Sequence, residues 1–385
     1  MIDDKGRYVL ENYAKKSVFS SFLPGISGIT GIPIWCYYTN RGQAITCFGS
    51  EDKEHAIMEF LPAHQAYIQT GRLGYRTFLK VNGSFMEAFT DVEEPHKMVI
   101  DQNMLEVEET NHTYGLCTHV TYYTLPEEKV GALVREVTFT NIDTKDMELS
   151  FLDGAPAIVP YGVDEHGLKH MTQTAKAWMQ VEDVEKKEPF FRVRASMEDS
   201  SQVVAIEGGN FSIGVDEAGN RLQPIVDTDV IFDFDTAYVM PYGFLTKEIE
   251  ELLAENQMTM NRVPCCFYAG KASLKPGQSI TIYEVTGQSA NKDIFHAFQQ
   301  KSFTKDYFTE KKERAVALTK EVTKVMETGT ASKAFDAYCR QNFLDNVLRG
   351  GMPISLGEKN QFYVYARKHG DMERDYNFFR ILPEF

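Results

Sequence analysis

A dense group of charged side chains near the end of the sequence is the strongest candidate for chemistry. Within nine positions the chain carries Arg367, Lys368, His369, Asp371, Glu373, Arg374 and Asp375. Guanidinium and carboxylate groups bind adjacent hydroxyls in pairs, and Tyr376 or Phe378 can stack on the face of a sugar ring. The predicted substrate-binding residues are Arg367, Lys368, His369, Asp371, Arg374 and Asp375. The alternative is a solvated loop whose charges pair with one another.

The same segment does not predict a catalytic pair. Inverting cleavage of a glycosidic bond needs two facing carboxyl groups, about 6.5–9.5 Å apart. Asp371, Glu373 and Asp375 lie on one short stretch beside Arg374, which favours ion pairing. We therefore assign no catalytic residue.

Two further patterns are weak. Gly25, Gly28 and Gly31 recur every three residues, but no helix follows them, so the pattern matches neither a P-loop nor a dinucleotide fingerprint. A surface loop leading into a strand and a loop reaching over a ligand both fit it. His166 and His170 are four apart without an evident third ligand, so no metal site is predicted.

Composition narrows the class of protein. A chain of 385 residues predicts two domains, or one large β domain with an appendage. The net charge of −15 is the wrong sign for binding a phosphate backbone, so we expect no nucleic-acid partner. The 43% hydrophobic and 12% aromatic residues allow a sizeable core.

The cysteines and the start of the sequence indicate the cellular compartment of the protein. Six cysteines match no disulfide scaffold or zinc pattern, which predicts free thiols. Acidic residues stand where a signal peptide needs basic ones, and no apolar run has the length of a membrane span. We expect a cytoplasmic protein without a membrane partner.

Residues 1–290 indicate β structure almost throughout. Runs rich in β-branched and aromatic residues, separated by turn residues, include 32–38, 44–48, 75–81, 116–124 and 280–286. Alternation over 133–141, followed by a turn and 147–152, predicts a hairpin with one buried face. Val230, Phe232 and Phe234 predict another strand by the same alternation. Segments 170–184 and 246–255 are the expected helices on a large antiparallel sandwich.

The pattern changes near Asn291. Helix-forming residues replace the alternation up to Leu348, with a second helix expected over 331–348 and ended by Gly350 and Gly351. A strand over 361–366 and the charged segment follow. We divide the chain into a sandwich (1–290), a helical linker (291–350) and the start of a further region (351–385). Because charged and aromatic residues run almost to Phe385, we expect the parent protein to continue.

Long stretches of the sequence resemble the amino-terminal part of 1,2-β-oligoglucan phosphorylases, which belong with cellobiose phosphorylases in glycoside hydrolase family 94. The stretches are 22–28, 31–43, 50–66 and 367–379. Residues 135–141 and the turn 274–278 resemble the sandwich domain of that clan more generally.

The resemblance implies an architecture and a reaction. It implies a galactose-mutarotase-like super-β-sandwich, a helical linker and the truncated start of an (α/α)₆ barrel. In such enzymes phosphate attacks the anomeric carbon with inversion, while an Asp in the barrel protonates the leaving oxygen. Inorganic phosphate is then a co-substrate, β-glucan oligosaccharide the other partner, and no cofactor is implied. The barrel acid is absent from this sequence, and a homodimer is left open.

Two functions from different classes therefore remain. The chain is either part of a phosphorylase acting on β-1,2-glucooligosaccharides and inactive by itself, or a stand-alone carbohydrate-binding or interaction module. Mutarotase-like catalysis in the sandwich is a third reading, which rests on analogy of fold alone.

Overall fold

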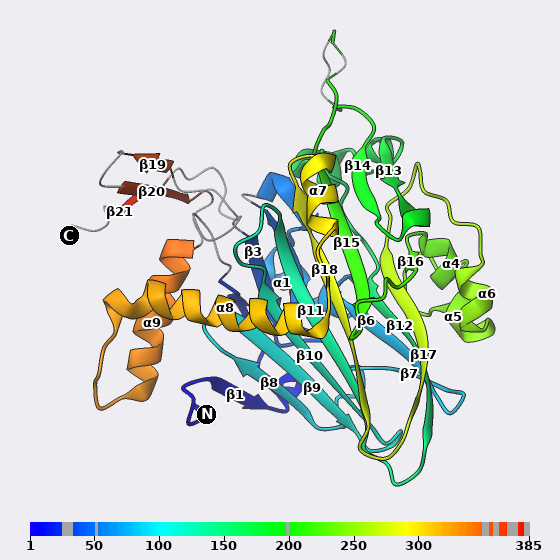
Figure 1. Ribbon diagram of the computed structural model, residues 1–385, viewed down its shortest axis with the longest axis horizontal. Coiled ribbons are helices and arrows are strands. Elements are labelled where there is room, and N and C mark those ends of the chain that lie inside the picture. Colours follow the sequence, from blue (N-terminus) through cyan, green and yellow to red (C-terminus); the bar gives the residue numbers. More distant parts are fainter. Residues whose placement is uncertain are drawn as a thin grey trace.

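The structure, a computed structural model, describes residues 1–24, 34–50, 53–197, 201–202, 204–348, 354–356, 362–367 and 376–380. It is mainly β: the strands form sheets of nine, five, four and three strands (Figure 1). Neighbouring strands in all four sheets run antiparallel. The expectation of a large antiparallel β architecture is confirmed. No part of a helical barrel is shown.

The two largest sheets form the body of the molecule. In spatial order the nine-stranded sheet contains β1 (Tyr8–Glu11), β8 (His96–Ile100), β9 (Met104–Asn111), β10 (Leu116–Thr124), β11 (Gly131–Asn141), β18 (Ser279–Ser289), β15 (Gly209–Asp216), β14 (Phe190–Val193) and β13 (Met179–Glu182). The five-stranded sheet contains β16 (Pro224–Ile225), β17 (Cys266–Leu274), β12 (Met147–Ala155), β6 (Arg76–Val81) and β7 (Ser84–Glu87). Their facing side chains share one apolar core, in which Phe139 stacks on Phe151 with ring centroids 5.6 Å apart.

Two smaller sheets complete the strands. The four-stranded sheet contains β2 (Ser20–Phe22), β3 (Ile34–Thr39), β4 (Ile45–Ser50) and β5 (Ala56–Met58), and its side chains join the same core. The three-stranded sheet contains β19 (Ile354–Leu356), β20 (Phe362–Arg367) and β21 (Tyr376–Arg380).

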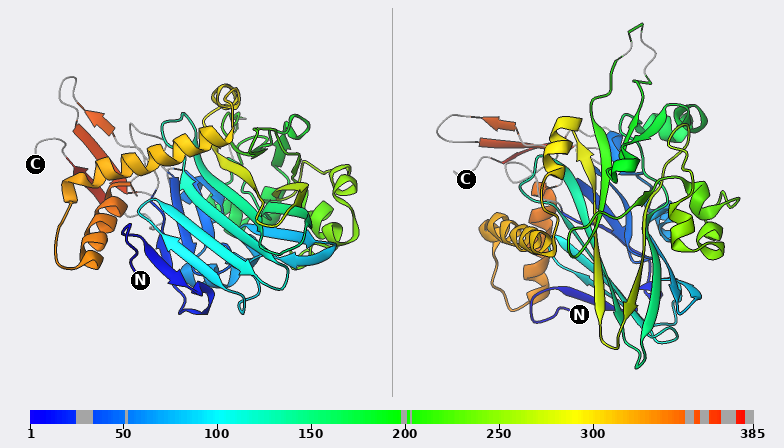
Figure 2. Two further views of the ribbon diagram at one scale, coloured as in Figure 1. Left: turned by 60° about the horizontal axis from the view of Figure 1, so that its bottom comes forward. Right: turned by 45° about the vertical axis from the view of Figure 1, so that its right-hand side comes forward.

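Helices cover the outer faces of both large sheets (Figure 2). The five-stranded sheet is covered by α4 (Thr228–Phe232), α5 (Tyr242–Thr246) and α6 (Ile249–Leu253). On the nine-stranded sheet lie α7 (Lys292–Gln299) and the start of α8 (Lys305–Thr323), where Phe295 stacks on Phe211 at 4.7 Å and Phe308 on Tyr283 at 4.3 Å. Most residues of a central strand such as β11 are therefore buried on both faces, although the strand also carries the polar residues Arg135 and Glu136.

The other helices lie at the ends of strands. They are α1 (Ala63–Leu73), α2 (Glu165–His170), α3 (Thr172–Lys176), α9 (Lys333–Leu348) and the 3₁₀ turns η1 (Tyr13–Lys15), η3 (Lys53–His55), η4 (Val184–Lys186) and η5 (Lys324–Met326). No helix in the described ranges combines the length and apolar character that crossing a bilayer requires. Strand β18 ends at Ser289, and Asn291 caps α7 by accepting the Ile294 N–H at 2.9 Å. The division into domains stays a prediction.

The expected hairpin of 133–141 with 147–152 is wrong. Strand β11 pairs with β10 and β18 in the nine-stranded sheet, whereas β12 pairs with β6 and β17 in the five-stranded sheet. The turn between them therefore carries the chain from one layer to the other. Alternation reports which side chains share a face, but not which strand is the neighbour.

Two expected elements differ in type. Residues 230–234, expected as a strand, lie in α4 and the turn after it, because Asp227 caps the helix by accepting the Asp229 N–H. The helix expected over 170–184 ends at Lys176, and the chain then enters β13. The helix expected over 246–255 is present as α6.

A buried charged cluster joins three sheets. Arg135 on β11 has no exposed side-chain surface, and its guanidinium donates to Asp153 Oδ1 on β12 at 3.0 Å and to Glu284 Oε2 on β18 at 3.2 Å. It also donates to the side chain of Gln43, in the turn between β3 and β4. The ring of Tyr75 lies over the guanidinium, 4.8 Å from ring centroid to Cζ. One cation thus holds groups from the nine-, five- and four-stranded sheets.

Two carboxyl groups face this one guanidinium. Burial raises the pKa of Glu284 well above its ordinary value of 4.5, and the nearby Asp153 raises it further, while Arg135 opposes both effects. The protonated form of Glu284 is therefore favoured more strongly in the folded protein than in the unfolded chain.

Removing the cation should destabilise the fold strongly. Arg135→Met leaves Asp153 buried without a counter-charge, and we expect the free energy of unfolding to fall by about 3–5 kcal/mol. Urea unfolding measures this loss. The control is Arg314→Met, since Arg314 pairs with Glu127 and Glu321 at the surface and should leave the midpoint nearly unchanged. Equal midpoints for the two variants would contradict the central role of Arg135.

Glu284 should make stability depend on pH. The folded protein keeps a proton that the unfolded chain releases near pH 4.5, so the free energy of unfolding declines above that pH until the raised pKa is passed. Glu284→Gln removes this titration and should flatten the decline in the free energy of unfolding that urea unfolding measures above about pH 5. If stability declines as steeply with pH in Glu284→Gln as in the surface control Glu321→Gln, another group causes the decline.

Candidate functional site

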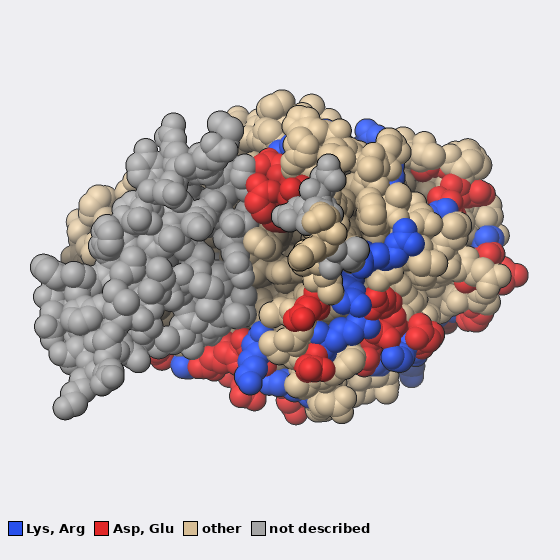
Figure 3. All heavy atoms as spheres, turned by 90° about the horizontal axis from the view of Figure 1, so that it is seen from above, with Lys and Arg blue, Asp and Glu red and all other residues tan. Residues whose placement is uncertain are grey.

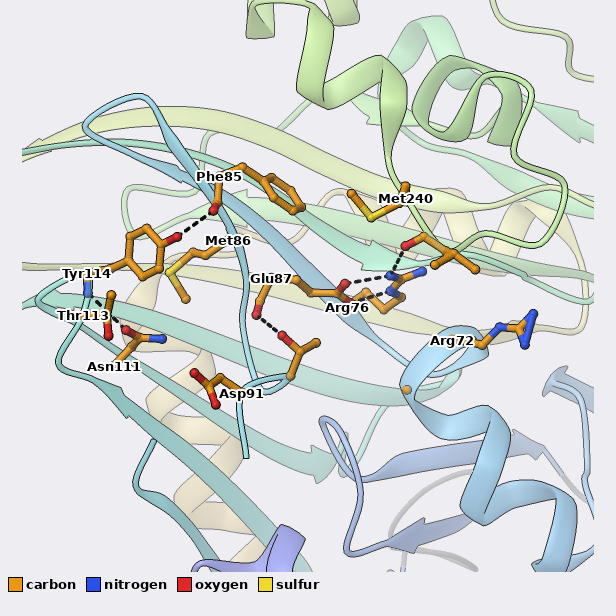
Figure 4. A pocket seen from close by; sticks show the side chains of 13 residues that line it. Arg72, Arg76, Phe85, Met86, Glu87, Asp91, Asn111, Thr113, Tyr114 and Met240 are labelled. Atoms are coloured by element: carbon orange, nitrogen blue, oxygen red, sulfur yellow. Dashed lines mark hydrogen bonds and ion pairs between the residues drawn. The ribbon is translucent and has the colours of Figure 1, made fainter. Parts of the chain in front are cut away.

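A groove of about 630 Å³ opens beside the β6–β7 hairpin, and we call it the sandwich groove (Figure 4). Four segments distant in sequence line it: the end of α1 and start of β6, strand β7 with the residues after it, the β9–β10 turn, and the loop before α5. The side chains that bear on the chemistry are those of Arg72, Arg76, Phe85, Glu87, Asp91, Asn111, Tyr114 and Met240.

Arg76 forms the wall between the hairpin and the loop before α5. Its Nε and Nη2 donate to the two carboxylate oxygens of Glu87 at 2.6 and 2.8 Å, a bidentate pair. The same guanidinium donates to the carbonyl oxygens of Tyr238 and of Val239, the latter at 3.0 Å. It also lies over the ring of Phe78, 4.6 Å from the centroid. The guanidinium of Arg76 is thus engaged in hydrogen bonds within the wall of the groove. It stabilises this wall rather than binding a ligand.

The opposite wall is the β9–β10 turn. Asn111 donates to Glu109 at 3.0 Å and accepts the Tyr114 N–H at 3.1 Å, so both ends of its amide are engaged. Tyr114 donates its hydroxyl to the Phe85 carbonyl at 2.9 Å, which ties this turn to β7. Burial raises the pKa of Glu109, which lies behind the turn and accepts the Phe89 N–H. The groove is therefore held open by bonds among its own lining residues.

The groups left for a ligand suit binding rather than bond cleavage. Arg72 is exposed and makes a 3.3 Å bond to the Ala237 carbonyl, and Asp91 is exposed and accepts the Glu93 N–H at 3.0 Å. Phe85 and Met240 add apolar surface beside these charges, as Figure 4 shows. The described lining has no histidine, cysteine or serine. Hydrogen-bonding groups beside an apolar face are typical of sites for neutral polar ligands.

Most of the predicted site residues fall outside the described part of the chain. Arg367 is the last residue of β20, and its backbone pairs with Tyr376 of β21. Lys368, His369, Asp371, Arg374 and Asp375 lie outside the described residues, as do Gly25, Gly28 and Gly31. The predicted substrate site therefore stays a prediction.

The other sequence patterns show no reactive arrangement in the described residues. The rings of His166 and His170 lie 5.1 Å apart, but no group of three metal-ligating side chains is found in the described ranges. All six cysteines are free thiols, as expected. Burial raises the pKa of Cys47 and of Cys266 to about 12, which leaves both thiols unreactive at neutral pH. The Arg135 cluster has the carboxyl groups that catalysis needs, but it is sealed from solvent.

The sandwich groove escaped the sequence analysis because no local motif encodes it. Its lining comes from residues 71–76, 85–91, 111–114 and 239–240, which only the fold brings together. The one local signal is the four-residue spacing of Arg72 and Arg76 across the end of α1. That spacing also fits an ordinary helix surface.

Comparison with known proteins gives no assignment by sequence. No family model matches the chain, and no curated protein matches it. Among solved structures, similarity is found to a protein described as a kojibiose phosphorylase from the human microbiome (10% identity, TM-score 0.30, 88% of this chain and 32% of that one). A bacterial glucoamylase in complex with acarbose shows 8% identity and a TM-score of 0.36, over 78% of this chain and 40% of that one.

A third similar structure is described as an aldose 1-epimerase from Klebsiella pneumoniae, with 9% identity and a TM-score of 0.32 over 77% of this chain and 91% of that one. The chain thus spans about a third of the phosphorylase and two fifths of the glucoamylase. TM-scores below 0.5 transfer neither a fold family nor a function from these proteins to this chain.

Arg76 should be sensitive even to a conservative change. Arg76→Lys loses the bidentate bond to Glu87 and at least one carbonyl bond, and we expect the free energy of unfolding to fall by about 1–3 kcal/mol. Limited proteolysis should also cut residues 233–241 faster, because Tyr238 and Val239 lose their donor. The matched control is Arg72→Lys, which should change neither. Unaltered proteolysis in Arg76→Lys would show that the loop is held without the guanidinium.

Proposed function

We propose that this chain is the amino-terminal portion of an inverting glycoside phosphorylase that converts β-1,2-glucooligosaccharides and inorganic phosphate into α-glucose 1-phosphate. Its sandwich would be of the galactose-mutarotase-like type, and the catalytic acid would lie in a barrel domain beyond this chain. No cofactor is part of the proposal, and oligosaccharide and phosphate are the partners. We place the enzyme in the cytoplasm, where free thiols such as those here persist.

One observation supports the proposal most directly: the described residues form an antiparallel sandwich that has a groove on its surface and no reactive group of side chains. The groove supplies hydrogen-bonding groups beside Phe85 and Met240, which suits a neutral sugar. The carboxyl groups closest to a catalytic arrangement, Asp153 and Glu284, have no access to a substrate. Such a chain serves best as the support of a catalytic domain. The sequence resemblance is the source of the proposed reaction, and the β-1,2 linkage is part of the proposal that the assay below tests.

The distribution of charge on the surface does not favour nucleic acid as a partner. Seen from above, the described residues show Lys and Arg interspersed with Asp and Glu rather than one basic field (Figure 3). Phosphate-backbone binding needs a continuous positive surface. The proposal keeps oligosaccharide and phosphate as ligands.

The alternative is a carbohydrate-binding module without catalysis, and the sandwich groove favours it specifically. Exposed Arg72 and Asp91 are the groups that a bound sugar would meet, with Phe85 as the apolar contact. In this reading the chain binds oligosaccharide and no reaction follows.

An activity assay tests the phosphorylase proposal. Phosphate release from α-glucose 1-phosphate with sophorose as acceptor is measured for this chain and for the complete reading frame that encodes it. We expect release with the complete protein and none with the 385-residue chain. No release from a folded complete protein would overturn the proposed linkage, and release from the 385-residue chain would overturn the placement of the catalytic acid.

A binding assay tests the groove separately. Calorimetric titration of the chain with β-1,2-glucooligosaccharides should show binding that Asp91→Asn and Phe85→Ala each weaken by about tenfold, the loss of a good polar or stacking contact. The control Asp143→Asn alters an exposed carboxylate in the turn after β11, outside the groove lining. Equal affinity in all three variants would remove the groove as a carbohydrate site.

A further inference from the structure

A second groove, of about 1240 Å³, lies between the linker helices and the edge of the nine-stranded sheet; we call it the linker groove. It is lined by residues of α8 and α9, of the start of the chain and of the β8–β9 turn. The side chain of Asn103, 2% exposed, donates to the Ala315 carbonyl on α8 at 3.1 Å. Gln341 on α9 donates to the Gln102 carbonyl at 3.4 Å. Packed elements, rather than a loop, therefore shape the groove.

Positive charge gathers in this groove although the chain as a whole carries −15. Its cationic lining residues are Lys5, Arg7, Lys320, Lys324 and Arg340, against the carboxylates Asp101 and Glu327. Arg7 is already neutralised by Asp3 at 2.9 Å and Glu106 at 3.2 Å. Asp336, four residues before Arg340 on α9, is near enough for the Arg340 charge to lower the pKa of its carboxyl group. No ion pair of Lys5, Lys320 or Lys324 is found among the described residues. A cleft in which one sign of charge is in excess attracts ions of the opposite sign.

Arg340 provides a second, independent observation. Its Nε–H is buried and has no acceptor among the described residues. A buried donor without an acceptor costs free energy. Because this nitrogen is shielded from solvent, a ligand in the groove would reach the exposed part of the Arg340 side chain. A Cβ placed on Gly6 would lie 3.9 Å from Arg340 Nη2, so this guanidinium lies beside the turn that carries Lys5. Lys320 on α8 and Lys324, the first residue of η5, line the same groove.

We propose that the linker groove binds a phosphate group, either free or esterified to a sugar. Lysine ammonium groups attract phosphate as point charges, and an arginine fork can donate to two of its oxygens. Tyr8, which is 46% exposed, lines the same groove and offers an apolar face to an attached sugar ring. The site is separate from the sandwich groove, and it stands whether or not the complete protein is a phosphorylase.

Calorimetric titration of the chain with inorganic phosphate, and separately with α-glucose 1-phosphate, at low ionic strength tests the proposal. Both ligands should bind, and Lys320→Ala and Lys324→Ala should each weaken binding by about tenfold, because each removes one charge-assisted contact. The matched control is Lys305→Ala on the same helix, whose ammonium binds Glu217 at 2.8 Å outside the groove. Circular dichroism of each variant verifies that it is folded.

The outcomes separate the sources of the phosphate group. Tighter binding of the ester than of inorganic phosphate supports a sugar phosphate, and equal binding supports recognition of phosphate alone. Absence of binding by either ligand overturns the proposal. So does an equal loss in Lys305→Ala, which would mean diffuse attraction to surface lysines.

Discussion

The arrangement of the sandwich depends on one buried guanidinium. Arg135 receives its partners from β12, β18 and the turn before β4, so three separately paired sheets meet at its hydrogen bonds. Apolar packing would tolerate a small slip of one layer past another, but a buried ion pair tolerates little, because a misplaced carboxylate stays unpaired in a medium of low dielectric constant. The cluster therefore sets the register between layers, while the apolar core contributes most of the burial energy.

The sequence indicates where strands lie better than it indicates which strands pair with one another. Strand β10 coincides with the predicted range 116–124, because alternating β-branched and aromatic residues report a pleated, half-buried surface. The same signal misassigned 230–234, where Val230, Ile231 and Phe232 face the sheet from a short helix. It also could not show that β11 and β12 belong to different sheets, since partner choice depends on contacts distant in sequence.

The prediction of sites was also limited because contacts between residues distant in sequence cannot be inferred from local patterns. Sequence reasoning selects clusters of adjacent residues, and it selected 367–375, which the described ranges do not test beyond the backbone of Arg367. Both grooves are instead assembled from distant segments: Arg72 and Tyr114 in one, Lys5 and Arg340 in the other. A site of this kind leaves in the sequence only single polar residues at the ends of elements, which ordinary surfaces also have.

The two grooves differ in how they relate to the linker. Helix α8 is fixed to the sandwich where Phe308 stacks on Tyr283 and where Lys312 pairs with Glu136 at 2.5 Å. Helix α9 meets the sheet edge through Gln341 and the neighbouring chain start. An anion held jointly by Lys320, Arg340 and Lys5 would therefore tie α9 to α8 and to the sheet, whereas a ligand in the sandwich groove contacts neither helix. Binding of an anion in the linker groove would thus be coupled by charge to the position of α9 relative to α8.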